Sequence, residues 1–412
     1  MNVKKLYAIF FIVYFTLGVF EAYFVLYLPL YYYEILNVNR SNLAFIQFLG
    51  YFSLIVTPVF AYIFDKYVKS ERNQKIVVLF CSISLCSCFS IFLYNKNILV
   101  LYGIFLGVYF LSRTFIRTIM SKLFLTLSVN SPKIKHNMIL IVNGATAVSF
   151  LFVSLFFDFT IQNLYSQQQW GMFFIIGWLL TLPLISIILL LRKSTIFTGY
   201  KKKNEKINIA QNIERNKGKT KPWFVIFLYI AFFLASSDLI FLSLVSSWVF
   251  TTHGEESLRF FFSFYYIFNI FSLLGYLVAS KIAKKISNIF LLFVFCSFYL
   301  FFLSFLPFSN FPLFIILQCS LSIVGYIANY MFVSISQTIS VNTRYKTLTF
   351  QTLLTCQSIA RIVFTPLGTS LSATASVEML IFISTILLSF SCLLQLVLVL
   401  VIKFKQVKGF NK

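Results

Sequence analysis

Five ionisable residues lie within long apolar stretches of this sequence: Glu21, Arg113, Arg117, Asp238 and Arg361. A charged side chain near the centre of a lipid bilayer is unfavourable, so residues of this kind usually face a cavity, pair with one another or take part in function. A carboxylate and a guanidinium group can form a charge-assisted hydrogen bond with each other or with a solute of opposite charge. These five residues are therefore the first candidates for a functional site.

The composition explains why these charges stand out. The 412-residue chain is 59% hydrophobic and 20% aromatic with only 11% charged residues, which is far more apolar than a soluble domain. The formal net charge of +23 could suggest a nucleic-acid-binding protein. The basic residues, however, form short clusters between apolar runs rather than one basic face, so we expect a multi-spanning membrane protein that binds no nucleic acid.

Twelve apolar segments are long enough to cross a bilayer as helices, since a hydrocarbon core of ~30 Å needs about 20 helical residues. We therefore predict an all-α membrane protein with twelve transmembrane helices in the lipid bilayer. The approximate limits of the segments are 6–30, 41–64, 76–94, 98–121, 138–160, 170–191, 222–250, 257–280, 287–306, 309–336, 347–371 and 377–402.

A basic segment, residues 192–221, separates the first six apolar segments from the last six. It contains ten Lys or Arg against two acids, and it cannot bury enough apolar surface to fold alone. We expect it to link an N-terminal six-helix bundle, residues 1–191, to a C-terminal six-helix bundle, residues 222–412.

The loop charges predict the orientation of the chain. If the N-terminus is cytoplasmic, 28 of the 34 Lys and Arg fall in cytoplasmic segments, and only Arg40, Lys96 and Arg259 fall in outer loops. This asymmetry alternates correctly at every loop, as the positive-inside rule requires. We therefore expect both termini and the linker on the cytoplasmic side of the plasma membrane.

The two halves share features that indicate a duplication. The loops after the second and eighth segments both carry Lys-x-x-Lys, beginning at Lys66 and Lys281, directly after an apolar helix end. Glu21 and Asp238 each lie about 15 residues into the first helix of their half, which is ~22 Å along a helix axis. The repeat therefore places the two acids at near-equivalent positions.

Two six-helix halves joined by a cytoplasmic linker, with both ends inside, resemble the major facilitator superfamily over nearly the whole chain. The loop after the second segment supports this resemblance, because Ala61, Asp65, Lys66 and Lys69 occupy places in the family signature Gly-x-x-x-Asp-Arg/Lys-x-Gly-Arg/Lys-Arg/Lys. Alanine replaces the first glycine, and the second glycine and the last basic residue are absent. The resemblance implies a role in the conformational switch for Asp65 and Lys66.

The charged residues also acquire roles from this resemblance. Several proton-coupled members of the superfamily pair an acid in the first helix with an arginine in the fourth. By that resemblance Glu21 is the candidate proton carrier, Asp238 is its counterpart in the second half, and Arg113 is a charge partner of Glu21 or a substrate ligand. Arg117 lies one helical turn from Arg113, nearer the cytoplasmic interface.

Further polar residues are expected beside the central cavity that the resemblance implies. Arg361 lies near the middle of the eleventh segment with Gln357 one turn before it, and Asn143 and Asn329 lie in the fifth and tenth segments. Either asparagine could instead bond one helix to another. Three intramembrane arginines against two deep acids leave this region positive, which favours an anionic or zwitterionic organic solute.

We expect neither a metal site nor a cofactor. The seven cysteines lie inside apolar runs without metal-ligand spacing, and the two histidines, His136 and His253, fall on opposite sides of the predicted membrane. The short outer loops also leave no room for a catalytic domain, so an enzyme is disfavoured.

The favoured function is secondary active transport of a small organic solute by alternating access, as proton-coupled uptake by a monomer. An efflux antiporter for drugs or metabolites is the alternative within the same fold, although the glycine-rich run typical of the fifth helix in drug antiporters is absent around Asn143. A receptor with this fold that no longer transports is the alternative from another class, because the signature loop is incomplete.

Overall fold

The computed structural model is helical throughout the part of the chain that it describes. Residues 192–221, the predicted linker, lie outside that part. The described residues are 3–67, 71–128, 132–163, 165–184, 222–242, 244–245, 248–249, 252, 255–283, 286–341, 343, 345–372 and 374–410.

The N-terminal half, meaning the described residues up to Leu184, contains six predicted segments. Its helical elements are α1 (Val3–Glu21), the π-helix η1 (Ala22–Tyr27), α2 (Leu28–Leu30), the π-helix η2 (Tyr31–Ile35), α3 (Arg40–Phe52), the 3₁₀-helix η3 (Ser53–Val56), α4 (Thr57–Lys66), α5 (Glu71–Tyr94), α6 (Leu99–Ser128), α7 (Pro132–Thr160) and α8 (Gln167–Thr181).

The C-terminal half, meaning the described residues from Pro222 onward, contains the other six. Its helical elements are α11 (Pro222–Ala235), the 3₁₀-helix η4 (Ser236–Asp238), α12 (Leu239–Leu242), α14 (Glu255–Ile282), α15 (Asn288–Phe305), the 3₁₀-helix η5 (Leu306–Phe308), α16 (Phe311–Val341), α17 (Lys346–Leu371) and α18 (Val377–Phe410).

The predicted all-α membrane protein is confirmed. Ten of the twelve predicted segments coincide with one helix or with short helical elements that follow one another directly. The other two, 170–191 and 222–250, begin with α8 and with α11, η4 and α12, and their predicted ends lie outside the described residues. Among the described residues, nine helical stretches are long and apolar enough to cross a membrane, and Tyr266–Ile282 is a shorter apolar helix. The chain is a multi-pass membrane protein.

The helix of the eleventh segment, α17, is too polar to be counted among those nine stretches. Its residues Gln351, Thr355, Thr365 and Thr369 are nevertheless buried. Polar side chains that are buried inside a membrane protein find partners on neighbouring helices. The sequence of α17 is therefore that of a helix in the interior of the bundle rather than one surrounded by lipid.

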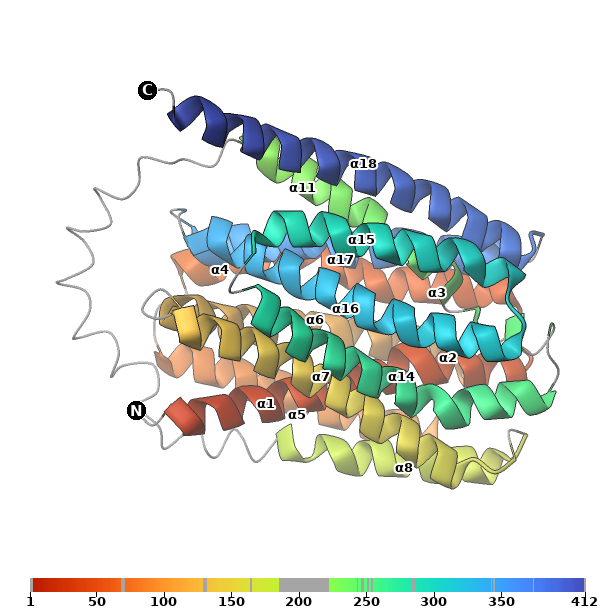
Figure 1. Cartoon of the computed structure of the whole chain (residues 1–412). Coiled ribbons are helices and arrows are strands. Elements are labelled where there is room, and N and C mark those ends of the chain that lie inside the picture. Colours follow the sequence, from red (N-terminus) through yellow and green to blue (C-terminus); the bar gives the residue numbers. More distant parts are fainter. Residues whose placement is uncertain are drawn as a thin grey trace.

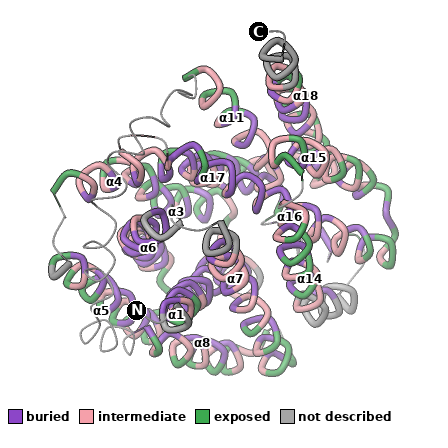
Figure 2. Tube along the Cα trace, turned by 60° about the vertical axis from the view of Figure 1, so that its left-hand side comes forward, coloured by how far each residue is buried: buried purple, intermediate pink, exposed green. Residues whose placement is uncertain are grey.

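The helices run roughly parallel to one another, and α1 begins at the same end of the structure at which α18 ends (Figure 1). We call this end the terminal face and the opposite end the far face. In a view turned toward the direction of the helix axes, α17 lies beside α3 and α4, between the remaining helices of the two halves (Figure 2). The halves meet along two lines of contact, α7 with α14 and α3–α4 with α17.

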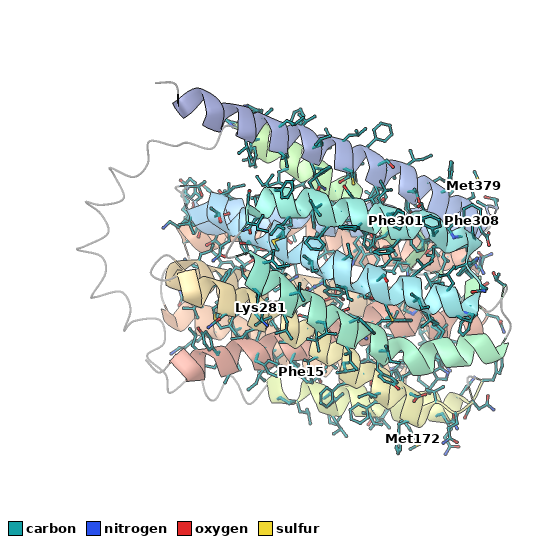
Figure 3. The ribbon with its side chains drawn as sticks, in the orientation of Figure 1. Phe15, Met172, Lys281, Phe301, Phe308 and Met379 are labelled. Carbon is teal, nitrogen blue, oxygen red and sulfur yellow. The ribbon has the colours of Figure 1, made fainter. Side chains whose placement is uncertain are left out.

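The exterior of the bundle is apolar. Phe301, Phe308 and Met379 project from α15, η5 and α18, and Met172 projects from α8 (Figure 3). Because a bilayer core offers no hydrogen-bond partners, a transmembrane helix satisfies its own backbone and presents apolar side chains to lipid. This surface is of the kind that lipid covers.

The first segment changes helical geometry directly after Glu21, where α1 gives way to the π-helix η1. Two tyrosines of α6 hold it at that point: the hydroxyl of Tyr109 donates to the carbonyl of Leu17, and the hydroxyl of Tyr102 donates to the carbonyl of Phe24, both at 3.0 Å. The tyrosines are two turns apart and so lie on one face of α6. They align α6 with the first segment, and π-helical turns of this kind are frequent at functional sites.

A glycine permits the close crossing of α12 and α17. A Cβ atom added to Gly368 would lie 1.6 Å from the carbonyl oxygen of Ile240. Ile240 follows the candidate acid Asp238 by two residues, so this crossing also fixes the position of η4 relative to α17. Only glycine allows the two backbones to approach so closely.

We expect Gly368→Ala to lower the free energy of unfolding by about 1–3 kcal/mol, because α12 and α17 must move apart to relieve the overlap. The apparent melting temperature of the purified protein in detergent measures this loss. Gly144→Ala is the matched control, since the nearest atom to its added Cβ, Cδ2 of Leu273, lies 4.0 Å away. Equal melting temperatures for the two variants would contradict the prediction.

Candidate functional site

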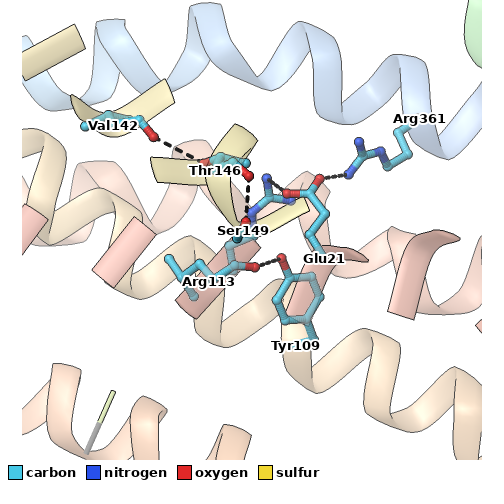
Figure 4. A network of polar contacts seen from close by, with 8 residues as sticks. Glu21, Tyr109, Arg113, Val142, Thr146, Ser149 and Arg361 are labelled. Atoms are coloured by element: carbon cyan, nitrogen blue, oxygen red, sulfur yellow. Dashed lines mark hydrogen bonds and ion pairs between the residues drawn. The ribbon is translucent and has the colours of Figure 1, made fainter. Parts of the chain in front are cut away.

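One carboxylate joins two arginines from different halves of the chain. Oε2 of Glu21 lies 2.6 Å from a guanidinium nitrogen of Arg113, and Oε1 lies 2.6 Å from a guanidinium nitrogen of Arg361. Figure 4 shows Glu21 between the two guanidinium groups. Glu21 comes from α1 and Arg113 from α6, whereas Arg361 comes from α17. This ion-pair bridge therefore ties the N-terminal half to the C-terminal half.

Arg113 and Arg361 lie near the middle of α6 and α17, and Glu21 lies inside the first segment, at the last residue of α1 before η1. Arg361 is 15 residues beyond the start of α17, or ~22 Å along its axis, and Arg113 is 14 residues beyond the start of α6, or ~21 Å. Glu21 is 18 residues beyond the start of α1, or ~27 Å along its axis. The side chains of Glu21 and Arg113 are 8% and 12% exposed, and that of Arg361 is 23% exposed. The bridge is thus deep within the helical bundle, and Arg361 is its most accessible member.

An aromatic ring supports both guanidinium groups of the bridge. The Cζ atoms of Arg113 and Arg361 lie 5.6 Å and 5.9 Å from the centroid of the Phe110 ring. Cations within about 6 Å of a ring face are attracted by its quadrupole. Phe110 therefore helps to hold the two positive groups near each other.

The bridge carries an excess of positive charge. One carboxylate is shared by two guanidinium groups, and no further acid is paired with either arginine among the described residues. A third arginine, Arg117, lies one turn along α6, with its Cζ atom 5.8 Å from the centroid of the Tyr14 ring. An anion that reached this region would meet uncompensated positive charge.

Two of the predicted cavity residues bond to each other beside the bridge. Nε2 of Gln357 donates to Oδ1 of Asn329 at 2.9 Å, and Nδ2 of Asn329 donates to the hydroxyl of Tyr276 at 3.1 Å. Gln357 lies one turn from Arg361, on the same face of α17. The ring of Tyr276 in turn contacts that of Tyr326, at 5.0 Å between centroids. Together these side chains form a polar and aromatic group from α14, α16 and α17.

The structure does not join Asn143 to this group. The residue is 9% exposed, and its Nδ2 atom is buried without a hydrogen-bond partner among the described residues. An unsatisfied buried amide of this kind is unfavourable and calls for a partner. The position of Asn143 beside the cavity therefore remains a prediction.

Asp238 has surroundings quite unlike those of Glu21. Its Oδ2 atom accepts a hydrogen bond from the hydroxyl of Tyr299 at 2.8 Å, and the salt bridges found among the described residues do not include it. Reciprocal hydrogen bonds between Ser237 and Ser384 fix η4 against α18. The two acids occupy corresponding places in the sequence, but only Glu21 is paired with arginine.

The signature loop contacts the other half of the chain. Oδ2 of Asp65 accepts a hydrogen bond of 3.0 Å from the backbone nitrogen of Leu348, in the first turn of α17. The ammonium group of Lys66 is exposed and lies 3.2 Å from the hydroxyl of Tyr62. Lys69 lies outside the described residues.

Two features of the site were missing from the sequence-based prediction. Arg361 was expected in the cavity but not as a partner of Glu21, although the excess of arginines over acids was a signal that one carboxylate would be shared. Tyr51 was not predicted at all. Its ring packs on Phe110 at 5.2 Å between centroids, and its buried hydroxyl has no hydrogen-bond partner among the described residues.

The fold is shared with solved transporters over nearly the whole chain. The nucleoside transporter NupG is 11% identical with a TM-score of 0.65, and the match covers 98% of this chain and 100% of NupG. FucP, a major facilitator superfamily transporter in the outward conformation, is 12% identical with a TM-score of 0.67 and coverage of 95% and 98%. The human organic anion transporter MFSD10 (TETRAN) is 10% identical with a TM-score of 0.65 and coverage of 96% and 100%.

No family model and no curated protein sequence matches this chain. The similarity to the solved transporters therefore lies in the structure, at low sequence identity. It confirms the predicted fold: this chain has the major facilitator fold. The proteins in which the fold was solved are named as transporters and not as enzymes.

Proposed function

We propose that this chain, which has the major facilitator fold, is a secondary active transporter of a small organic anion or zwitterion. The observation that carries the proposal is the bridge from Arg113 through Glu21 to Arg361, which joins the two halves near mid-depth. In transporters built from two such halves, substrate sites lie between the halves near the bilayer midplane, and rocking of the halves gives alternating access. A charged contact at that place is suited both to binding a substrate and to switching between the conformations open to either side.

The bridge suggests how a substrate could act on the switch. A carboxylate or phosphate group offers the same kind of acceptor oxygens as Glu21 and can receive the same charge-assisted hydrogen bonds from arginine. A substrate anion that bound Arg361 would replace Glu21 and release the tie between the halves. Differential contact of this sort is what allows a ligand to shift a conformational equilibrium.

The local charge favours an anion over a cation. One carboxylate between two guanidinium groups leaves a net positive charge, and a monovalent anion would neutralise it. The neighbouring amide and phenol groups of Gln357, Asn329 and Tyr276 offer hydrogen bonds to the uncharged part of an organic solute. The relatives in structure include an organic anion transporter and a nucleoside transporter, which is compatible with such a solute without identifying it.

We further propose that the two acids divide the work of coupling. Both carboxylate oxygens of Glu21 are paired with guanidinium groups, so protonation of either oxygen would break an ion pair. Asp238 is partly buried, and its partner is the uncharged phenol of Tyr299 rather than a cation. Protonation would therefore remove a negative charge that no cation balances. Asp238 is therefore the stronger candidate for the proton carrier, and Glu21 for the substrate-sensitive switch.

The charges of the loops support an orientation with both termini and the basic linker in the cytoplasm, and we propose the plasma membrane as the location. In this orientation the terminal face is cytoplasmic. Uptake is the proposed direction, and efflux by antiport remains the alternative within the same fold. A monomer suffices, because the site is formed by two halves of one chain.

Uptake into proteoliposomes tests the proposal. Radiolabelled organic anions and zwitterions, together with neutral analogues of the same size, are offered with and without an inward proton gradient. We expect at least one anion or zwitterion to accumulate above its outside concentration only when the gradient is present. A ligand that raises the melting temperature but never crosses the membrane would overturn transport in favour of the receptor function. Uptake restricted to the neutral analogues would overturn the substrate class.

A further inference from the structure

The helix α17 is held at both of its ends by charged residues of one segment of the N-terminal half. At the terminal face, Asp65 accepts the hydrogen bond from the backbone nitrogen of Leu348 at 3.0 Å. At the far face, a guanidinium nitrogen of Arg40 donates to the carbonyl oxygen of Ser372, the C-cap residue of α17, at 3.1 Å. Arg40 is the first residue of α3, and Asp65 is the next-to-last residue of α4.

The sign of each charge matches the end of the helix that it contacts. The first turn of a helix presents unsatisfied N–H groups and a partial positive charge, and the last turn presents unsatisfied C=O groups and a partial negative charge. The acid meets the positive end of α17, and the arginine meets its negative end. Exchanging the two charges would make both contacts repulsive, so the arrangement is specific.

Between its ends, α17 makes further hydrogen bonds to the N-terminal half. Nε2 of Gln351 donates to Ser121 at 2.8 Å near the terminal face, and Thr369 donates to Gln47 at 3.4 Å near the far face. The bridge from Arg361 to Glu21 lies between these two contacts. The structure therefore holds α17 against the N-terminal half at both faces and in the middle.

Arg40 is itself held in place at the far face. Its Cζ atom lies 4.3 Å from the centroid of the Tyr33 ring, and its guanidinium group also bonds to the Tyr33 hydroxyl. Tyr33 belongs to η2, at the far-face end of the first segment. Arg40 thus connects the first and second segments to α17 at one point.

We propose that Arg40 is a gating residue of the far face and the counterpart of Asp65 at the terminal face. Separation of Arg40 from Ser372 opens the far face, and separation of Asp65 from Leu348 opens the terminal face. This inference rests on the proposed alternating access, in which one face opens while the other stays closed. When α17 contacts both Arg40 and Asp65, as it does here, both faces are closed.

Distances between spin labels on the two halves test the gating role without any need for transport. After replacement of the seven native cysteines, Asn42→Cys with Thr374→Cys reports the far face, and Asn73→Cys with Ser287→Cys reports the terminal face. All four labelled positions lie in or next to helix ends, and no substrate is added.

Arg40→Gln should raise the population with a long far-face distance by about threefold or more, as expected for loss of a favourable contact between a charge and a helix end. The distance at the terminal face should stay short. Asp65→Asn should have the opposite effect, with the terminal face opening and the far face remaining closed.

Lys96→Gln is the matched control for Arg40→Gln. Lys96 is also a cation at the far face, but its ammonium group lies beside Gly171 in α8 rather than at α17. Unchanged far-face distances in Arg40→Gln would overturn the gating role, and so would the same increase in Lys96→Gln. Because these distances do not depend on substrate, a protein that fails to transport would refute the proposed function and leave this test intact.

Discussion

Arg361→Gln is expected to reduce uptake of an anionic substrate by at least about 30-fold when the substrate is below saturation. Removing one partner of a buried, hydrogen-bonded charge pair costs about 2–5 kcal/mol, and each 1.4 kcal/mol is about tenfold in affinity. The guanidinium group of Arg361 is the most accessible member of the bridge and the one supplied by the C-terminal half. Its loss removes both a proposed substrate ligand and the tie between the halves. Initial rates in proteoliposomes measure the effect.

The matched control is Arg117→Gln. Arg117 carries the same charge one turn from Arg113 on α6, but it lies over the Tyr14 ring and forms no salt bridge among the described residues. We expect a much smaller loss of uptake from this variant, whereas Arg113→Gln should resemble Arg361→Gln. Elution as a single species and a cooperative thermal transition establish that each variant is folded. Wild-type uptake by Arg361→Gln would remove this residue from the substrate site.

The arrangement of helices could be predicted from the sequence because its cause is local. A run of about 20 apolar residues forms a helix in a bilayer, where each backbone group must be satisfied within its own segment. Nine helical stretches among the described residues meet this requirement, whereas α17 is too polar for it and is explained by its place inside the bundle. The irregular turns inside the segments do not follow from it, because η1 and η4 depend on hydrogen bonds from other helices, such as that from Tyr102 to the carbonyl of Phe24.

The candidate site was only partly predictable because its contacts join distant segments. Glu21 and Arg113 could be related through the known pairing of a first-helix acid with a fourth-helix arginine. The contact of Glu21 with Arg361 spans 340 positions of the sequence and depends on how the two halves meet. The repeat also suggested equivalent positions for the two acids, yet Glu21 is paired with one arginine from each half, whereas the partner of Asp238 is Tyr299 of its own half.

Arg40 illustrates the same limit. From the sequence it is one of three basic residues in outer loops, and nothing there distinguishes it from Lys96. Its contact with the end of α17 arises because α3 and α17 lie side by side, so that the first residue of one helix meets the C-cap of the other. Charges in short loops are therefore weak evidence of function until the packing of their helices is known.

Asp238→Asn is expected to abolish accumulation driven by a proton gradient while substrate exchange across the membrane continues. Asparagine has nearly the same shape as aspartate but cannot gain or lose a proton, so the substrate site stays intact and only the coupling is lost. Accumulation should fall to the level reached without a gradient. Counterflow of labelled against unlabelled substrate, measured in the same proteoliposomes, should persist. Tyr299→Phe removes only the hydrogen bond to Asp238, and we expect it to alter the pH dependence of uptake without abolishing it.

Glu21→Gln separates the two proposed roles of the acids. A neutral amide cannot hold both guanidinium groups as the carboxylate does, so we expect this variant to lose exchange as well as accumulation. If Glu21→Gln instead kept exchange and lost only accumulation, while Asp238→Asn accumulated substrate as the wild type does, the proton would belong to Glu21. The two substitutions remove the same charge at similar depth, so the different outcomes expected depend on the partners of each acid: two arginines for Glu21 and one tyrosine for Asp238.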